Sequence, residues 1–274
     1  MTWNTTDDAL TRLRAAKGFV FDMDGVLYLG TQRLPGVQEL FDALALRGRK
    51  VMLATNNSMS TPDAYVTKLA GMGINVPASA ILTSAIATRD YLLRTLAPGS
   101  SIFVVGMPAL SEQLFDDVPF RRAESGEQPD ALVIGLDRQF TYDKLKEASA
   151  MLREGARFVA TNADATLPTE SGLVPGAGSV VAALSVASGR TPEIIGKPET
   201  PLMEMAIARM GIAPHEAVMI GDRLDTDVIA GHRAGMLTAM VLTGVSTREE
   251  AAVAAIAPDL IANDLPSITA ALVG

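Results

Sequence analysis

The residues with the clearest chemical potential are Asp22 and Asp24, two carboxylates that directly follow the apolar stretch Gly18 to Phe21. The stretch predicts a short buried strand, at whose end positions i and i+2 point to the same side. Neighbouring carboxylates repel each other unless a cation lies between them or one of them holds a proton. Asp-x-Asp-Gly also suits an ordinary turn. Because a fold does not need this pair for stability, the pair indicates a functional site.

Other polar residues stand where further apolar stretches end. They are Thr55, Asn56, Lys197, Asp222 and Asp227. Carboxylates that share one rim suit a hard divalent ion such as Mg²⁺, which takes oxygen ligands. A hydroxyl, an amide and an ammonium suit the oxygens of a phosphoryl group, and a carboxylate can act as a nucleophile that forms an aspartyl-phosphate. Each residue alone has a simpler explanation, such as a strand end, a Gly-Lys-Pro turn or an acid that favours a helix dipole. Their occurrence in order, each at a strand end, favours phosphoryl chemistry.

The elements that must position these residues follow a strand–helix alternation. Strands are expected at 18–21, 50–58 and 217–222, and helices at 37–46, 62–72, 200–210 and 228–234. This order predicts a parallel sheet with right-handed crossovers. Sites in such sheets lie beyond the carboxyl ends of the strands, so the polar residues should share one rim. The predicted fold class is α/β, with a doubly wound, Rossmann-like parallel sheet.

A second series of elements interrupts this core. Helices are expected at 84–96, 142–154 and 180–187, strands at 101–105, 131–136 and 157–161, and a polar loop between Thr161–Asp164 and Pro175–Ser179, while 107–129 has too weak a pattern to assign. We therefore predict a core formed by residues 1–83 and 188–274 and an inserted domain at 84–187.

Composition excludes several classes of function. The chain has 274 residues, a net charge of −8, no cysteine and two histidines. An acidic chain with no basic stripe argues against nucleic-acid binding. Without cysteine there are no disulfides, no thiolate catalysis and no thiolate–metal sites. The polar N-terminus does not resemble a signal peptide, and no uncharged apolar run approaches membrane-spanning length. We expect a cytoplasmic protein that does not bind membranes.

The same residues resemble the four motifs of the haloacid dehalogenase (HAD) superfamily of phosphatases. The matching segments are Asp22-Met23-Asp24-Gly25-Val26, Leu53-Ala54-Thr55-Asn56-Asn57, Gly196-Lys197-Pro198 and Gly221-Asp222-Arg223-Leu224-Asp225-Thr226-Asp227. The insertion between the second and third motifs is similar to the C2 cap of the type IIA branch, the NagD-like or p-nitrophenylphosphatase-like proteins. The resemblance covers about residues 18 to 247 and implies an α/β core with an inserted α/β cap.

This resemblance implies a role for each residue. Asp22 would be the nucleophile, and Asp24 the acid that protonates the leaving oxygen and then the base that activates water. Mg²⁺ would be held by the carboxylates of Asp22 and Asp222 and by the backbone carbonyl of Asp24, with Asp227 orienting these ligands. Thr55, Asn56, Asn57 and Gly25 would bind the phosphoryl group, and Lys197 would balance its charge. The proton that Asp24 must carry predicts a raised pKa for Asp24 in the substrate complex.

The implied reaction is hydrolysis of a small-molecule phosphate monoester such as p-nitrophenyl phosphate, phosphoglycolate, pyridoxal phosphate or a sugar phosphate. A dehalogenase of this fold would not need Asp24, and a receiver-like signalling module would not need a cap. A phosphotransferase or phosphomutase on the same core, and a catalytically silent phosphometabolite-binding protein, stay as alternatives. The cap residues expected to face the substrate are Asn162, Asp164 and the 175–179 turn, and a homodimer formed through the cap is possible in this branch.

Overall fold

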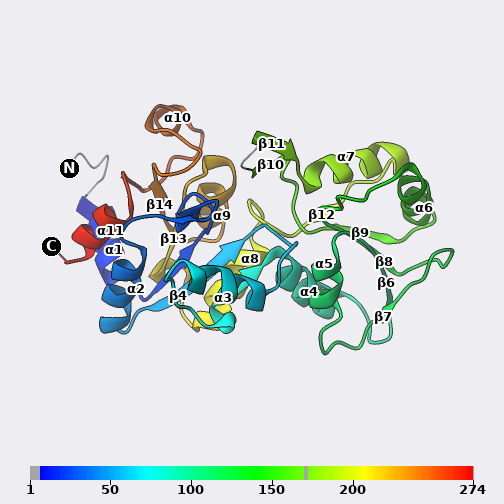
Figure 1. The fold of residues 1–274 in the computed structure, drawn as a ribbon, viewed down its shortest axis with the longest axis horizontal. Coiled ribbons are helices and arrows are strands. Elements are labelled where there is room, and N and C mark those ends of the chain that lie inside the picture. Colours follow the sequence, from blue (N-terminus) through cyan, green and yellow to red (C-terminus); the bar gives the residue numbers. More distant parts are fainter. Residues whose placement is uncertain (1–6, 170–171, 274) are drawn as a thin grey trace. The chain divides into compact units, whose positions relative to one another are not determined.

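The computed structural model describes residues 7–169 and 172–273. Its contacts divide the chain into two compact units (Figure 1). The first unit contains residues 7–55, 62–82 and 197–273, and the second contains residues 56–61 and 83–196. The assignment of residues 84–187 as a substrate-selecting cap stays a prediction. Within the described ranges, no helix has the length and apolar character needed to cross a membrane.

A six-stranded sheet forms the centre of the first unit. Its order is β15 (Leu260–Ala262), β14 (Leu237–Val241), β13 (Ala217–Gly221), β1 (Gly18–Phe21), β4 (Lys50–Thr55) and β5 (Ile81–Thr83). β1 pairs in parallel with β13 and with β4, and Phe21 lies opposite both Ile220 and Leu53. These three strands therefore end at nearly the same level, which brings the residues that follow them to one rim.

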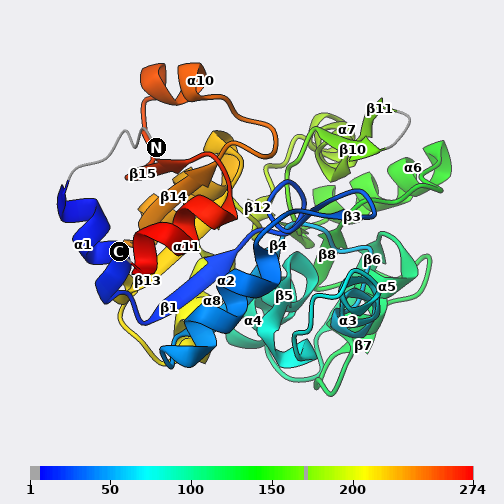
Figure 2. The same cartoon turned by 60° about the vertical axis from the view of Figure 1, so that its left-hand side comes forward.

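Helices surround this sheet because both of its faces are apolar. They are α1 (Asp7–Ala15), α2 (Val37–Leu46), α3 (Pro62–Gly71), α8 (Pro201–Met210), α9 (Ile229–Arg233), α10 (Arg248–Val253) and α11 (Leu265–Val273). Phe19 and Phe21 share a buried cluster with residues of α1, α2 and α11, and Figure 2 shows α2 and α11 on the near side of the sheet. Alternate residues of a strand face opposite sides of the sheet. On the side opposite Phe19 and Phe21, a Cβ on Gly18 would lie 2.5 Å from the sulfur of Met210, at the end of α8. A small hairpin of β2 (Tyr28–Leu29) and β3 (Gln32–Arg33) follows β1.

The second unit has its own five-stranded sheet, in which every described pair of strands is parallel. Its order is β12 (Glu193–Ile194), β9 (Arg157–Ala160), β8 (Ala131–Ile134), β6 (Ser101–Val105) and β7 (Arg121–Arg122). Its helices are α4 (Ser84–Thr95), α5 (Pro108–Leu114), α6 (Tyr142–Arg153) and α7 (Ala177–Ser188). Leu152 of α6 and Leu184 of α7 lie in one buried cluster with Leu132 and Phe158 of the sheet, and α6 and α7 lie side by side in Figure 1. The predicted α/β class with a parallel-sheet core is confirmed.

Several elements differ from those predicted. The expected polar loop before α7 contains an antiparallel pair, β10 (Thr166–Thr169) and β11 (Gly172–Pro175). α7 begins at Ala177, three residues before the predicted start, because the chain at Ala163 packs against its first turn: a Cβ on Gly178 would lie 2.3 Å from the Ala163 carbonyl oxygen. The expected helix at 228–234 begins earlier, as a π-helical turn at Leu224–Val228. The unassigned segment 107–129 contains α5 and β7.

Candidate active site

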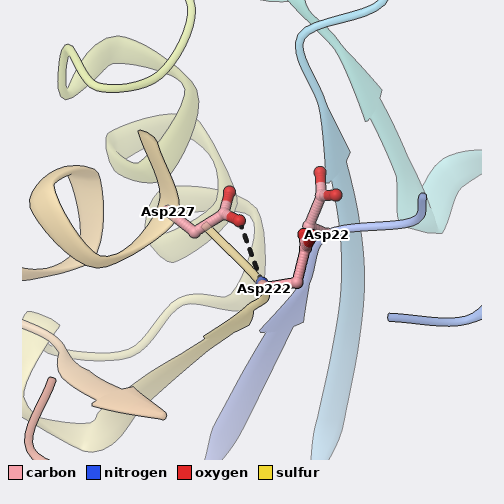
Figure 3. A group of neighbouring side chains, drawn as sticks. All are labelled: Asp22, Asp222 and Asp227. Carbon is pink, nitrogen blue, oxygen red and sulfur yellow. Dashed lines mark hydrogen bonds between the residues drawn. The ribbon is translucent and has the colours of Figure 1, made fainter. Parts of the chain in front are cut away.

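Three carboxylates meet at the carboxyl ends of β1 and β13. Asp22, Asp222 and Asp227 each offer one oxygen, and these oxygens all lie within 4.8 Å of one another. Figure 3 shows Asp22 at the end of β1 and Asp222 at the end of β13, with Asp227 turned back toward the backbone of Asp222. The parallel register of the two strands therefore produces the predicted convergence of acids.

Lys197 supplies the positive charge of this cluster. Its side chain is only 2 % exposed, and its Nζ lies 2.5 Å from Asp22 Oδ1 and 2.7 Å from Asp227 Oδ1. The same nitrogen donates to the Ala54 carbonyl at 3.1 Å. Burial alone would lower the pKa of Lys197, but the charges of Asp22 and Asp227 outweigh burial and raise it. Lys197 is therefore a fixed ammonium that contacts the predicted nucleophile.

Asp227 is fully engaged by protein donors. Its Oδ1 accepts from Lys197, and its Oδ2 accepts the backbone N–H groups of Asp222 and Arg223, each at 3.2 Å. The carboxylate fits beneath the strand end because residue 221 is glycine: a Cβ there would lie 2.2 Å from Asp227 Cβ. This geometry suits a residue that orients Lys197 and the Asp222 backbone, and that role stays a prediction.

Asp222 has one satisfied and one unsatisfied carboxylate oxygen. Its Oδ2 accepts the Val245 N–H at 2.8 Å, whereas its buried Oδ1 has no hydrogen-bond partner among the described residues. Burial, together with the charge of Asp227, raises the pKa of Asp222 to about 7. A buried carboxylate oxygen without a donor is a group that a divalent cation would satisfy. The donor set of Asp22 and Asp222 therefore fits Mg²⁺.

Two glycines make room for the Asp222 carboxylate. A Cβ on Gly25 would lie 2.5 Å from Asp222 Oδ2, and one on Gly244 would lie 2.0 Å from the same atom. Gly25 also has a φ of 82°, which side chains rarely adopt. Its N–H donates to the Tyr28 carbonyl at 2.9 Å. Gly25 thus acts sterically in this structure, and its binding of phosphate stays a prediction. Gly244 and Val245 were not predicted, because a Gly-Val pair after a strand carries no signal of its own.

Asp24 is set apart from the acidic cluster. Its carboxylate is accessible to solvent and accepts the Tyr28 hydroxyl at 3.2 Å. The Lys68 ammonium lies 3.8 Å from the centre of the Tyr28 ring. Desolvation by the surrounding protein raises the pKa of Asp24, although the charge of Lys68 and the Tyr28 hydrogen bond oppose the shift. This is the direction predicted for the substrate complex. Sequence reasoning missed Tyr28 and Lys68, although a tyrosine four residues after the acid was a visible signal.

The second predicted motif spans the border of the two units. Thr55 ends β4 with its side chain buried, and Asn56 and Asn57 follow it in the chain. Asn56 Nδ2 donates to both carboxylate oxygens of Asp164, at 3.1 and 3.2 Å. Asn57 Oδ1 accepts the Met59 N–H at 2.7 Å, the contact of a local turn. Phosphoryl binding by these three residues stays a prediction.

Comparison with known proteins gives consistent matches. The family model of haloacid dehalogenase-like hydrolases matches residues 19–117, and a HAD-hydrolase-like model matches residues 194–268. An acid sugar phosphatase of Staphylococcus aureus is 38% identical over 238 residues, which cover 87% of this chain and 91% of that protein.

Two solved structures are also similar to this chain. One is a glycerol phosphate phosphatase of Mycobacterium tuberculosis in complex with magnesium, with 36% identity, a TM-score of 0.87 and coverage of 94% of this chain and 78% of that chain. The other is NagD of E. coli K-12, with 32% identity, a TM-score of 0.84 and coverage of 91% of this chain and 97% of that chain. Both matches extend over the first and the second unit.

Proposed function

Because this chain belongs to the haloacid dehalogenase-like hydrolases and is a phosphoric monoester hydrolase of their NagD-like branch, we propose that it hydrolyses small-molecule phosphate monoesters in a Mg²⁺-dependent reaction through an aspartyl-phosphate. The observation that carries this proposal is the contact of the Lys197 ammonium with Asp22 beside the unsatisfied oxygen of Asp222. One carboxylate is thereby held for attack, and another is left for a cation.

Asp22 and Asp24 divide the chemistry. An Asp22 oxygen forms a bond to phosphorus while the bond from phosphorus to the ester oxygen breaks, and Asp24 gives its proton to that leaving oxygen. Asp24 then takes a proton from water, whose oxygen attacks phosphorus and releases phosphate and the Asp22 carboxylate. Lys197 Nζ lies 2.5 Å from Asp22 Oδ1, and this contact restricts the carboxylate to one orientation.

A divalent ion would bind at the carboxylates that meet at this rim. Asp22 and Asp222 would hold it through their carboxylates, and Asp24 through its backbone carbonyl. When bound, Mg²⁺ supplies positive charge that offsets the repulsion between the carboxylates and a phosphate dianion. The relative in complex with magnesium supports this choice of metal.

Removal of divalent metal is expected to abolish phosphate release, and added Mg²⁺ is expected to restore it. The measurement is colorimetric phosphate release from p-nitrophenyl phosphate, phosphoglycolate, pyridoxal phosphate, glycerol phosphate and a sugar phosphate, after dialysis against EDTA. A second readout is the thermal unfolding midpoint, which should rise with Mg²⁺ in the wild type because a bound ion stabilises the folded state. Asp222→Asn should lose most of that rise. Two results would contradict the metal assignment: full activity after EDTA treatment, or a rise of the unfolding midpoint with Mg²⁺ that is as large in Asp222→Asn as in the wild type.

Asp24→Asn is expected to discriminate between leaving groups. The value of kcat/KM reports the first chemical step, in which p-nitrophenolate departs readily as an anion whereas an alkoxide needs a proton. We expect Asp24→Asn to lower kcat/KM for glycerol phosphate by about 10²- to 10⁴-fold, and to lower it much less for p-nitrophenyl phosphate. Asp42→Asn, an exposed acid on α2, is the control and should change neither value. Equal losses on both substrates would reject Asp24 as the general acid.

The inserted segment 84–187 is proposed to select the leaving group. Asp22, Asp24 and Lys197 act on the phosphoryl group and the ester oxygen, which all phosphate monoesters share, so these residues do not discriminate between substrates. The substrate panel separates this enzyme from a silent binding protein, which would release no phosphate. Addition of an acceptor alcohol separates it from a phosphotransferase, which would produce a new phosphate ester instead of free phosphate.

A further inference from the structure

Asn56 is held by a polar network that lies within the second unit. Its backbone carbonyl accepts from Ser84 Oγ at 2.6 Å and from Asn162 Nδ2 at 2.8 Å. Its side-chain amide donates to both oxygens of Asp164. The Asp164 N–H in turn donates to Asn162 Oδ1 at 3.1 Å. The short segment after β9 that contains Asn162 and Asp164 thus contacts both the backbone and the side chain of Asn56.

These contacts fix the orientation of the Asn56 carboxamide. An ionised carboxylate only accepts hydrogen bonds, so the NH₂ group must face Asp164 and the carbonyl oxygen must face away. The opposite side is closely packed, because a Cβ on Gly196 would lie 2.6 Å from Asn56 Oδ1. Asn56 is only 8 % exposed. A flipped carboxamide would turn its carbonyl oxygen toward the carboxylate, where two acceptors repel each other.

We propose that Asp164 is a positioning residue for phosphate binding, which it promotes by holding the NH₂ group of Asn56 in one orientation. The proposal rests on the proposed function and on the prediction that Asn56 donates to a phosphoryl oxygen. Both oxygens of Asp164 accept from the NH₂ group, and the negative charge of the carboxylate polarises the amide and strengthens it as a donor. A residue more than one hundred positions away in the sequence thereby sets the affinity of Asn56 for phosphate.

The test compares Asp164→Ala with Asp164→Asn in the full-length protein with Mg²⁺. Loss of a hydrogen bond to a charged group should raise both KM for p-nitrophenyl phosphate and the inhibition constant of inorganic phosphate by about tenfold in Asp164→Ala, with a smaller change in kcat. Asp164→Asn retains an acceptor oxygen and should stay within about threefold of the wild type. Asp143→Ala, an exposed acid on α6, is the control. Thermal unfolding verifies that each variant is folded.

A double-mutant cycle separates positioning from general structural damage. In an Asn56→Ala background, Asp164→Ala should cause no further rise in either constant, because the group that it positions is absent. If KM and the inhibition constant of phosphate are unchanged in Asp164→Ala, the inference is overturned. It is also overturned if both constants fall, because Asp164 would then compete with phosphate for the Asn56 amide. The inference is overturned as well if the effects of Asn56→Ala and Asp164→Ala on these constants simply add in the double mutant. If the wild type releases no phosphate from any ester, the proposed function itself fails, which is a distinct outcome.

Discussion

Lys197→Met is expected to lower kcat for p-nitrophenyl phosphate by about three orders of magnitude. A charge pair about 4 Å apart at an effective dielectric near 20 is worth about 4 kcal/mol, and this energy corresponds to about a thousandfold in rate. Lys197 Nζ lies closer than this to both Asp22 and Asp227. Methionine retains the length of the side chain and removes only the charge and the hydrogen bonds.

The structure offers a matched control for this substitution. Lys17 Nζ also lies 2.5 Å from a carboxylate oxygen, that of Glu216, but its side chain is 58 % exposed. Exposed ion pairs contribute little, so Lys17→Met should leave kcat unchanged. Lys197→Met also leaves two buried acids without their counter-ion, which lowers stability. Activity must therefore be expressed per folded molecule, measured below the unfolding transition. A loss of only a few-fold would reject the role of Lys197.

The sequence predicted which side chains lie close together where their positions follow directly from strand ends. Asp22 and Asp222 each follow an apolar strand, and the parallel β1–β13 register brings them together without any further information. Lys197 was also recognisable, because it stands between glycine and proline at the end of an apolar segment. In such cases local pattern and topology agree, so residues more than 170 positions apart could be placed on one rim.

The remaining parts of the site depend on contacts that no local pattern records. Gly244 and Gly25 are required by the volume of the Asp222 carboxylate, and a sequence does not state which side chain fills the space beside a glycine. Tyr28 reaches Asp24 because the hairpin of β2 and β3 turns the chain back. The start of α7 was predicted too late for a similar reason. The small residues at its first turn have weak helical signal, and packing against the segment at Ala163 stabilises that turn.

Asp22→Asn is expected to abolish turnover while it stabilises the metal-free protein. Removal of a nucleophile from an enzyme that works through a covalent intermediate can cost about 10⁶-fold, so we expect a loss of at least about 10⁴-fold in kcat. The amide oxygen of asparagine can still accept from Lys197, so the geometry around Lys197 should persist. Asp42→Asn on α2 is the control and should retain full activity. Residual turnover within about a hundredfold of the wild type would reject Asp22 as the nucleophile.

The stability of Asp22→Asn follows from the electrostatics of the same cluster. Burial raises the pKa of Asp22 well above its usual value, and the charges of Asp227 and Asp222 add to this effect against the opposing charge of Lys197. An acid with a raised folded-state pKa destabilises the folded protein at pH values above its unfolded-state pKa, and this penalty fades as pH falls toward about 4. The unfolding midpoint of Asp22→Asn should therefore exceed that of the wild type at pH 7 in EDTA, and the difference should shrink as pH is lowered.

Mg²⁺ should also reduce the difference between the two unfolding midpoints, because only the wild type offers both carboxylates to the ion. A midpoint below that of the wild type in EDTA at pH 7 would mean that the Lys197–Asp22 ion pair outweighs the cost of burying the Asp22 charge.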